Sequence, residues 1–216
     1  MTSPMVAELA KSGRAAVLQN CDLQGLNLAR LDLADWRFEK CNLGGALFKG
    51  ALLERAVFTG CRAAGASFVS AICTEAQIAG GDFNNTSFRG ATLAAMKIKG
   101  CKMIGADLSE TRAIGLELTE VLFGLALLPG LSFRKTTLNG VDFSEADLRS
   151  CDFRETVFED CSLRDANLTG CRFEQADLRG ADLGGIKLGD ARRFKGALIS
   201  KRQAADLLGQ LGLFVQ

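Results

Sequence analysis

The sequence predicts a solenoid, a chain that winds around one axis and turns after every five residues. The stretch CRFEQADLRGADLGG, residues 171 to 185, contains three five-residue units in a row, each with Leu or Phe at its third place. A step of five advances an α-helix by roughly 140°, so Phe173, Leu178 and Leu183 would scatter around a helix. In a β-strand the same step would place successive units on opposite faces. Only a backbone that bends after each unit keeps these side chains pointing at one axis.

Internal repetition of this kind extends over most of the chain. Counting by fives from Ala16 to Asp190 gives 35 pentads without insertion or deletion, and Leu or Phe occupies 29 of their third positions. First positions are mostly small, with 14 Ala and seven Cys. Fifteen fifth positions are Gly, the residue that tolerates the dihedral angles of a repeated corner. Charged residues fall almost wholly on positions two, four and five, so positions one and three are expected to form the interior.

Pentads such as CDLQG, ADLSE, ADLRS, ANLTG and ADLRG occur in one frame, and this pattern resembles the pentapeptide-repeat family, whose motif is A-(D/N)-L-x-x. The resemblance implies an all-β solenoid, a right-handed quadrilateral β-helix in which four pentads form one coil. Residues 16–190 would then make about nine coils, a rod roughly 42 Å long at about 4.8 Å per coil. Such a rod is one domain in which each coil contacts only its neighbours.

A short N-terminal helix is expected within residues 1–15. Ser3 has the side chain of an N-cap, Pro4 suits the first helical position and Gly13 suits the end of a helix. A helix in this place would cover the open β-edge of the first coil.

The C-terminal segment, residues 191–216, predicts a second helix. Ser200 and Gln203 have capping-box spacing, Ala204 begins an apolar stripe at helical spacing, and Gly212 is expected to end the helix. One interpretation is a cap on the last coil. The tail is also similar to the one that follows the repeats in quinolone-resistance pentapeptide proteins, where it joins two subunits tail to tail. That resemblance implies a homodimer with an interface formed by Leu207, Leu208, Leu211 and Phe214.

The composition favours a cytoplasmic protein without a cofactor or metal. Of the 216 residues 48% are apolar, but no run of about 18 uncharged apolar residues predicts a membrane span, and the N-terminus lacks the apolar region of a signal peptide. All eight cysteines fall at inward positions, seven of them first positions and Cys73 a third position. The chain has no C-x-x-C pair and no His, which removes the usual zinc spacings.

The cysteines are expected to act as small core residues in a reducing compartment. A disulfide is the less favoured alternative. Cys21, Cys41 and Cys61 belong to one wall of the square, where stacked side chains point in parallel and do not face each other.

The sequence argues against an enzyme. It has no His and no Tyr, and its glycines follow the pentad period and not the spacing of a phosphate-binding loop. A filled square rod also offers little concavity for a substrate. Acidic residues at second and fifth positions are expected to lie outside, in water, and not to act as acids or bases.

Charge is distributed unevenly behind a net charge of +1. Residues 1–105 carry a net +4, residues 106–190 a net −7 and residues 191–216 a net +4. Folding the repeat into four walls puts many of the acids on two neighbouring walls. The acids expected to bind a partner are Glu117, Glu120, Asp142, Glu145, Glu159, Asp160, Asp165, Asp177 and Asp182. An opposite wall carries the basic residues Arg112, Arg134, Lys135, Arg154 and Arg172.

The family resemblance also implies a function for these walls. Quinolone-resistance members of the Qnr and MfpA kind are acidic rods that mimic DNA, bind DNA gyrase or topoisomerase IV and protect it from inhibitors. In such a rod carboxylates replace phosphates and compete for the same Lys and Arg side chains. The expected partners are therefore a topoisomerase subunit and a second copy of the chain, with no direct contact to nucleic acid or to a membrane.

The alternative function is a pentapeptide-repeat scaffold that binds some other protein. Outward Leu122, Leu125 and Leu127 predict an apolar patch in the middle of the rod, close to Ile104 and Ile114. Several exposed apolar side chains together indicate a contact site, whereas scattered ones are ordinary on a protein surface.

Overall fold

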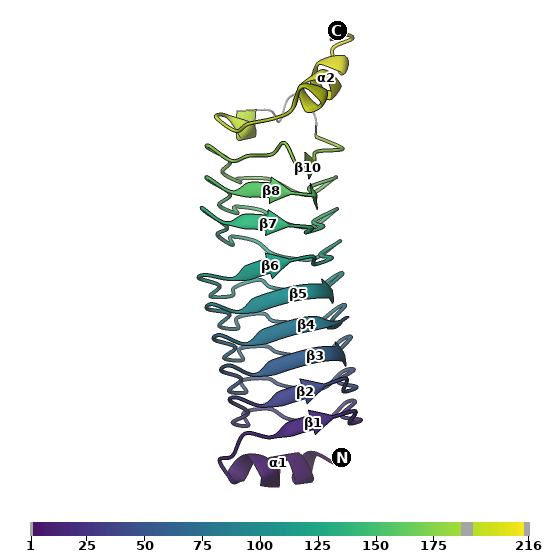
Figure 1. Cartoon of the computed structure of the whole chain (residues 1–216), viewed down its shortest axis with the longest axis vertical. Helices are drawn as coiled ribbons and strands as arrows, with labels where there is room; N and C mark the ends of the chain where they lie inside the picture. Colours follow the sequence, from purple (N-terminus) through teal and green to yellow (C-terminus); the bar gives the residue numbers. More distant parts are fainter. Residues whose placement is uncertain (1, 187–191, 214–216) are drawn as a thin grey trace.

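The chain folds into a rod of stacked coils, seen in a computed structural model that describes residues 2–186 and 192–213 (Figure 1). Parallel bridges join residues that are 20 apart, from Val17 with Arg37 at one end to Ser162 with Asp182 at the other. One coil is therefore four pentads, which confirms the predicted solenoid. Helix α1 (Ser3–Lys11) covers the first coil, and helix α2 (Lys201–Gly209) lies at the opposite end of the rod.

The coil has four walls, which we number by their first pentads: wall 1 from residues 16–20, wall 2 from 21–25, wall 3 from 26–30 and wall 4 from 31–35. Wall 1 holds a parallel sheet of eight strands. Its strands are β1 (Val17–Gln19), β2 (Arg37–Glu39), β3 (Val57–Arg62), β4 (Gln77–Asp82), β5 (Lys97–Lys102), β6 (Glu117–Thr119), β7 (Thr137–Asn139) and β8 (Val157–Glu159). Strands β9 (Cys161–Ser162) and β10 (Ala181–Asp182) pair on wall 2. Elsewhere on walls 2, 3 and 4 single bridges repeat from coil to coil.

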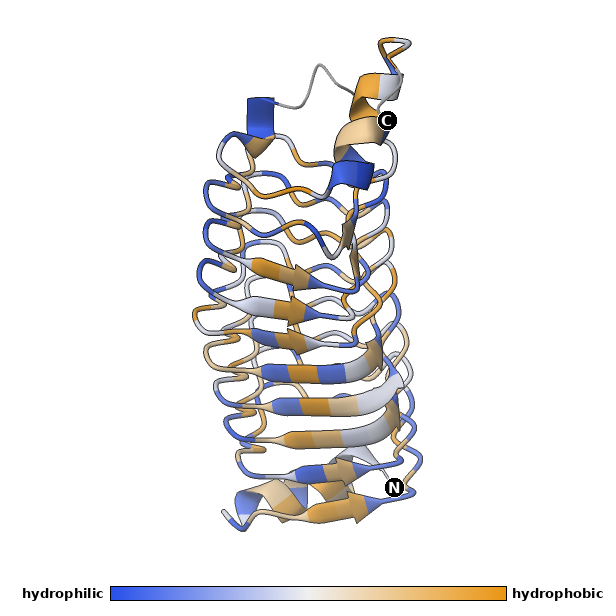
Figure 2. Cartoon of the chain, turned by 45° about the horizontal axis from the view of Figure 1, so that its top comes forward, coloured by the Kyte–Doolittle hydropathy of each residue, from blue (hydrophilic) through white to orange (hydrophobic). Residues whose placement is uncertain are grey.

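First and third positions form the interior, as predicted. Third-position side chains from Leu18 to Leu178 are buried, with Ala113 as the exception. Phenylalanines one coil apart stack face to face: the ring centroids of Phe48 and Phe68 are 4.8 Å apart and their planes differ by 2°. In strands such as β2, β5 and β7 an apolar residue stands between two polar ones, and Figure 2 shows this as an orange segment between blue or pale ones.

All eight cysteines are free, and seven of them are buried. The thiol of Cys61 donates a hydrogen bond to the Phe38 carbonyl in the coil below, at 3.2 Å. Burial raises the pKa of Cys61 and Cys101 to about 11 and that of Cys73 to about 12. These thiols therefore stay protonated at neutral pH and serve as small core residues.

The corner after each pentad has a left-handed backbone. Between residues 20 and 185 every fifth position except Gly180 has a φ between +50° and +80°. Glycine suits this conformation, but 19 such positions hold other residues, most of them polar. The corner therefore tolerates side chains that point away from the rod.

Asp and Asn at second positions have a structural role that the repeat pattern alone does not reveal. The backbone N–H of the fourth position makes no bond to the next coil, and the second-position carboxylate or amide oxygen accepts it. Asp142 accepts the N–H of Ser144 at 2.9 Å, and Asp182 accepts that of Gly184 at 2.9 Å. This side-chain turn explains the (D/N) of the motif. The expectation that these acids are merely solvated was therefore wrong for many second positions.

Helix α1 packs on the first coil through buried Val6 and Ala10, which confirms the predicted cap. Ser3 is not its N-cap, however, because the helix begins at Ser3 itself and Thr2 precedes it. The Ser3 hydroxyl instead accepts the backbone N–H of Asn27 at 3.0 Å, which ties the helix to the first coil. Gly13, with a φ of +65°, follows the helix as predicted.

One step of the stack is incomplete, and we call it the open step. It lies between residues 110–116 and residues 129–137, on wall 4 and the start of wall 1. One coil below, the N–H of Arg112 donates to Ala91 at 3.0 Å and that of Leu93 to Arg112 at 2.8 Å. In the described chain no backbone hydrogen bond of this kind joins the two sides of the open step. Strands β6 and β7 pair only through Thr119 and Asn139, whereas the other neighbouring strands of wall 1 pair through three or more residues.

The sequence at the open step departs from the repeat. Ala113 stands at a third position in place of Leu or Phe and is only half-buried. Leu116 and Leu131 put large side chains at first positions, where small residues let neighbouring coils approach. The open step thus combines a small third-position residue with two large first-position residues.

Candidate protein-binding surfaces

The nine carboxylates expected to bind a partner lie together on walls 1 and 2 of the C-terminal half, and we call them the acidic surface. All nine are exposed or half-buried. Between residues 117 and 182 these two walls carry only two basic residues, Arg164 and Arg179. The 20-residue register therefore gathers acids that are as much as 65 residues apart in the sequence.

Second-position members of the acidic surface are engaged within the rod. Glu117 forms an ion pair with Lys97 at 3.0 Å, and Asp182 forms one with Arg164 at 2.8 Å. Hydrogen bonds from the neighbouring guanidinium lower the pKa of Asp177. Basic side chains of the rod therefore partly neutralise the charge of these second-position acids in the absence of a partner protein.

Fifth-position members lie on the two corners that border wall 2. Glu120 and Asp160 are on the corner between walls 1 and 2, and Glu145 and Asp165 are on the corner between walls 2 and 3. All four are exposed, and their side chains make no ion pair or hydrogen bond with other described residues. Glu120 and Asp160 are two coils apart, about 10 Å, whereas Glu145 and Asp165 are one coil apart, about 5 Å. The remaining member, Glu159, accepts a hydrogen bond from the Asn139 amide at 2.9 Å.

An exposed apolar patch lies on the corner between walls 2 and 3, N-terminal to these acids. We call it the apolar corner, and its members Ile104, Leu122, Leu125 and Leu127 are 38%, 38%, 59% and 42% exposed. Ile114, which was expected nearby, stands on wall 4, opposite wall 2, and is 85% exposed beside the open step.

Most basic residues of wall 4 form ion pairs with acids on the same wall, for example Arg134 with Glu155 at 2.8 Å.

Helix α2 begins with the predicted capping box. The Gln203 N–H donates to the Ser200 hydroxyl at 3.2 Å, and the Ser200 N–H donates to the Gln203 side chain at 2.6 Å. The Gln203 amide also donates to the carbonyls of Leu178 and Ala181, at 2.8 and 2.7 Å. The helix ends at Gly209, so the prediction that it runs to Gly212 was wrong, because a turn intervenes.

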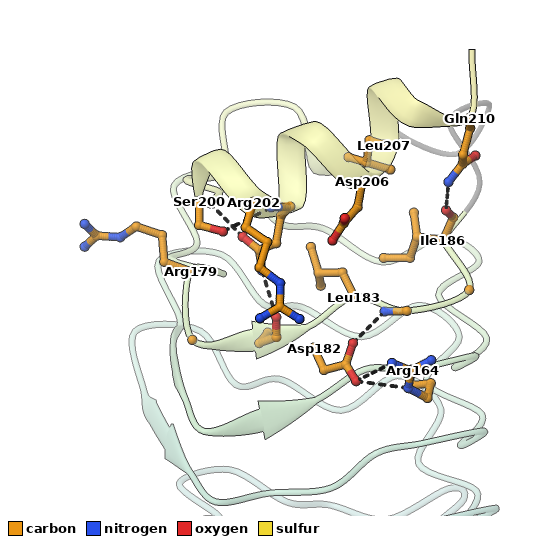
Figure 3. A pocket seen from close by; sticks show the side chains of 15 residues that line it. Arg164, Arg179, Asp182, Leu183, Ile186, Ser200, Arg202, Asp206, Leu207 and Gln210 are labelled. Atoms are coloured by element: carbon orange, nitrogen blue, oxygen red, sulfur yellow. Dashed lines mark hydrogen bonds and ion pairs between the residues drawn. The ribbon is translucent and has the colours of Figure 1, made fainter. Parts of the chain in front are cut away.

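No residue of helix α2 is fully buried. Leu207 is half-buried and lines a cavity of about 550 Å³ between the helix and the last coil, together with Arg202 and Asp206 (Figure 3). Leu208, Leu211 and Leu213 are 36%, 61% and 53% exposed. Phe214, the fourth residue expected in a dimer interface, lies outside the described residues.

Comparison with known proteins settles the family. One model of pentapeptide repeats (8 copies) matches residues 37–72 and 71–109, and another (9 copies) matches residues 123–167 and 133–198. Together the matches span well over half of the sequence. The chain belongs to the pentapeptide-repeat family. The interval between the two sets of matches contains Ala113 and Leu116 of the open step, where the repeat is least regular.

Solved structures of QnrB1, a plasmid-mediated fluoroquinolone resistance protein, are similar to this pentapeptide-repeat protein. The full-length form has a TM-score of 0.67 and 22% identity, covering 91% of this chain and 100% of that chain. A trypsin-treated form has a TM-score of 0.66 and 20% identity, covering 94% and 98%. At these identities the likeness shows a shared fold. No curated protein sequence matches the chain.

Of the helices in the described ranges, neither has the length and apolar content needed to cross a membrane. Across residues 2–186 and 192–213 no group of three or more His, Cys, Asp or Glu side chains has an arrangement that suits a metal ion.

Proposed function

We propose that this protein is a non-enzymatic DNA mimic that binds DNA gyrase or topoisomerase IV in the cytoplasm and protects it from inhibitors such as quinolones. The acidic surface carries the proposal, with nine carboxylates against two arginines on two adjacent walls. Those residues extend over about 16 Å of rod at about 4.8 Å per coil. A net −7 over that length is one charge per about 2.3 Å, compared with about 1.7 Å for duplex DNA.

The acidic surface would act by occupying the Lys and Arg side chains with which a topoisomerase grips DNA. The corner carboxylates Glu120, Glu145, Asp160 and Asp165 make no ion pair or side-chain hydrogen bond with other described residues, so their pairing with a basic surface breaks no described contact of this kind. Binding of this kind weakens as salt is raised. It needs no direct contact with nucleic acid, membrane or cofactor.

We also propose that α2 joins two copies of the chain. Leu208, Leu211 and Leu213 are exposed, and a second copy would cover them in a two-fold symmetric contact. The acidic surfaces of both rods would then lie near the junction, with the basic N-terminal parts at the far ends. Leu208→Asp with Leu211→Asp is expected to give a folded monomer in light scattering. A parent protein that is already monomeric at micromolar concentration would rule out this dimer.

Supercoiling by purified gyrase, with and without a fluoroquinolone, tests the main proposal. Added protein is expected to restore supercoiling in the presence of the drug, and less so as salt is raised. If it has no effect on gyrase or topoisomerase IV at any concentration, the proposal fails. The second candidate, a scaffold for another protein, is supported by the apolar corner, which a pure DNA mimic does not require.

A further inference from the structure

We propose that the apolar corner docks into a groove on the bound protein that has an apolar floor and Lys or Arg side chains on the rim facing Glu145 and Asp165. This inference rests on the proposed function and deepens it, because it adds a second contact that DNA mimicry does not supply. The bound protein that carries this groove is the topoisomerase.

The four side chains of the apolar corner form one convex edge. Leu122 lies between Lys102 and Asp142 in the ladder of wall 2, and Leu127 lies on the adjacent wall 3. Leu125 stands on the corner between them. Ile104 lies one coil below Gly124, which has no side chain to cover it. A corner of a square rod is convex, so a complementary partner surface must be concave.

The backbone conformation of Leu125 is energetically unfavourable for a leucine. Its φ is +59°, a conformation that disfavours a bulky side chain. The other described non-glycine residues with a positive φ are all polar, except Ala95. At 59% exposed, Leu125 gains little from burial in the rod itself. Burial against the described residues therefore does little to offset the backbone strain, whereas insertion of the Leu125 side chain into an apolar groove would offset it.

Leu122 and Leu127 also cannot form the side-chain turn that Asp or Asn makes at second positions, because leucine has no oxygen to accept the N–H. In pentad 126–130 the fourth residue is Pro129, which has no N–H for such a turn to hold. The ordinary second-position acid is thus replaced by leucine on two adjacent walls at one height of the rod.

Charge around the apolar corner sets the orientation of the partner. Glu145 lies one coil above Leu125, and Asp165 lies one coil above Glu145; both are exposed and make no ion pair with described residues. Asp142 lies above Leu122, and Lys102 lies below it. The side of the patch toward the C-terminus is therefore acidic, and the matching rim of the groove is basic.

Binding of purified gyrase to two leucine variants tests the inference. Leu125→Gly removes the side chain and relieves the backbone, and Leu122→Asp restores the family motif. Both are expected to melt at or above the parental temperature yet bind gyrase at least tenfold more weakly. Leu47→Ser is the matched control, because Leu47 is a 43% exposed second-position leucine of wall 3 in the N-terminal half, and it should bind like the parent.

Glu145→Lys with Asp165→Lys tests the basic rim and is expected to weaken binding further when combined with Leu125→Gly. If both leucine variants bind as tightly as the parent, the docking groove is refuted while the acidic contact stands. If the parent itself binds neither gyrase nor topoisomerase IV, both the groove and the proposed function are refuted.

Discussion

The N-terminal half of the rod, residues 16–110, and the C-terminal half, residues 119–185, share an interior and differ in outer charge. Phe48 stacks on Phe68 with centroids 4.8 Å apart in the first half, and Phe153 stacks on Phe173 at 5.1 Å in the second. Outside, residues 1–105 carry a net +4 and residues 106–190 a net −7. The pentad thus restricts which residue types can occupy the inward positions and leaves the outward positions free to vary. The residues that determine function are therefore expected on the outer surface.

The open step separates these halves. Each coil contacts only its neighbours, so one weak step does not disturb the register of the rest. The bridges on walls 2 and 3 continue across it, for example between Lys102 and Leu122. The halves are therefore joined along two walls and loosened along the others.

The largest expected effect concerns the shared interior. Phe143→Ala in the C-terminal half and Phe58→Ala in the N-terminal half should each lower the free energy of unfolding by about 3–5 kcal/mol, through lost burial and a residual cavity. Urea unfolding measures both. A large cost in one half and almost none in the other would show that the interiors are not equivalent.

The open step should be visible in amide hydrogen exchange. The amides of Ala113, Gly115 and Ser132 are expected to exchange at least tenfold faster than those of Leu93 and Arg112, since a missing hydrogen bond lowers the free energy of local opening by roughly 1.4 kcal/mol. Equal protection on both sides of the step would mean that the ladder closes in solution.

Much of the fold follows from the sequence because the period of five is strict. It predicts which positions are buried, and Ser200 with Gln203 identifies the start of α2. The roles of second-position Asp were missed because they depend on which backbone N–H the coil leaves unpaired. The open step was missed because Ala113, Leu116 and Leu131 are each tolerable alone, and their combined effect appears only when neighbouring coils are stacked. Ion pairs such as Lys97 with Glu117 also require the 20-residue register.

A smaller effect is expected on acidification, mainly in the C-terminal half. Hydrogen bonds from Arg149 lower the pKa of Asp147 below its ordinary value of 3.8. A lowered folded-state pKa stabilises the protein above the unfolded-state pKa, and this contribution is lost as pH falls through the folded-state pKa. Asp147→Asn keeps an oxygen for the side-chain turn but loses the charge. It should destabilise by about 0.2–1 kcal/mol at pH 7. In urea unfolding that difference should shrink as the pH falls below 3.8 and through the folded-state pKa; a difference that does not shrink on acidification would contradict this assignment.

The most direct test of the account reverses charges on one corner of the rod and measures protection of gyrase supercoiling from a fluoroquinolone. Glu120→Lys with Asp160→Lys should abolish protection and leave the melting temperature nearly unchanged, because exposed charges contribute little to stability. The control, Lys99→Glu with Lys102→Glu, changes two exposed charges beside the same corner one coil nearer the N-terminus and should protect at least as well as the parent. Full protection by the Glu120→Lys, Asp160→Lys variant would contradict the claim that the acidic surface binds the enzyme.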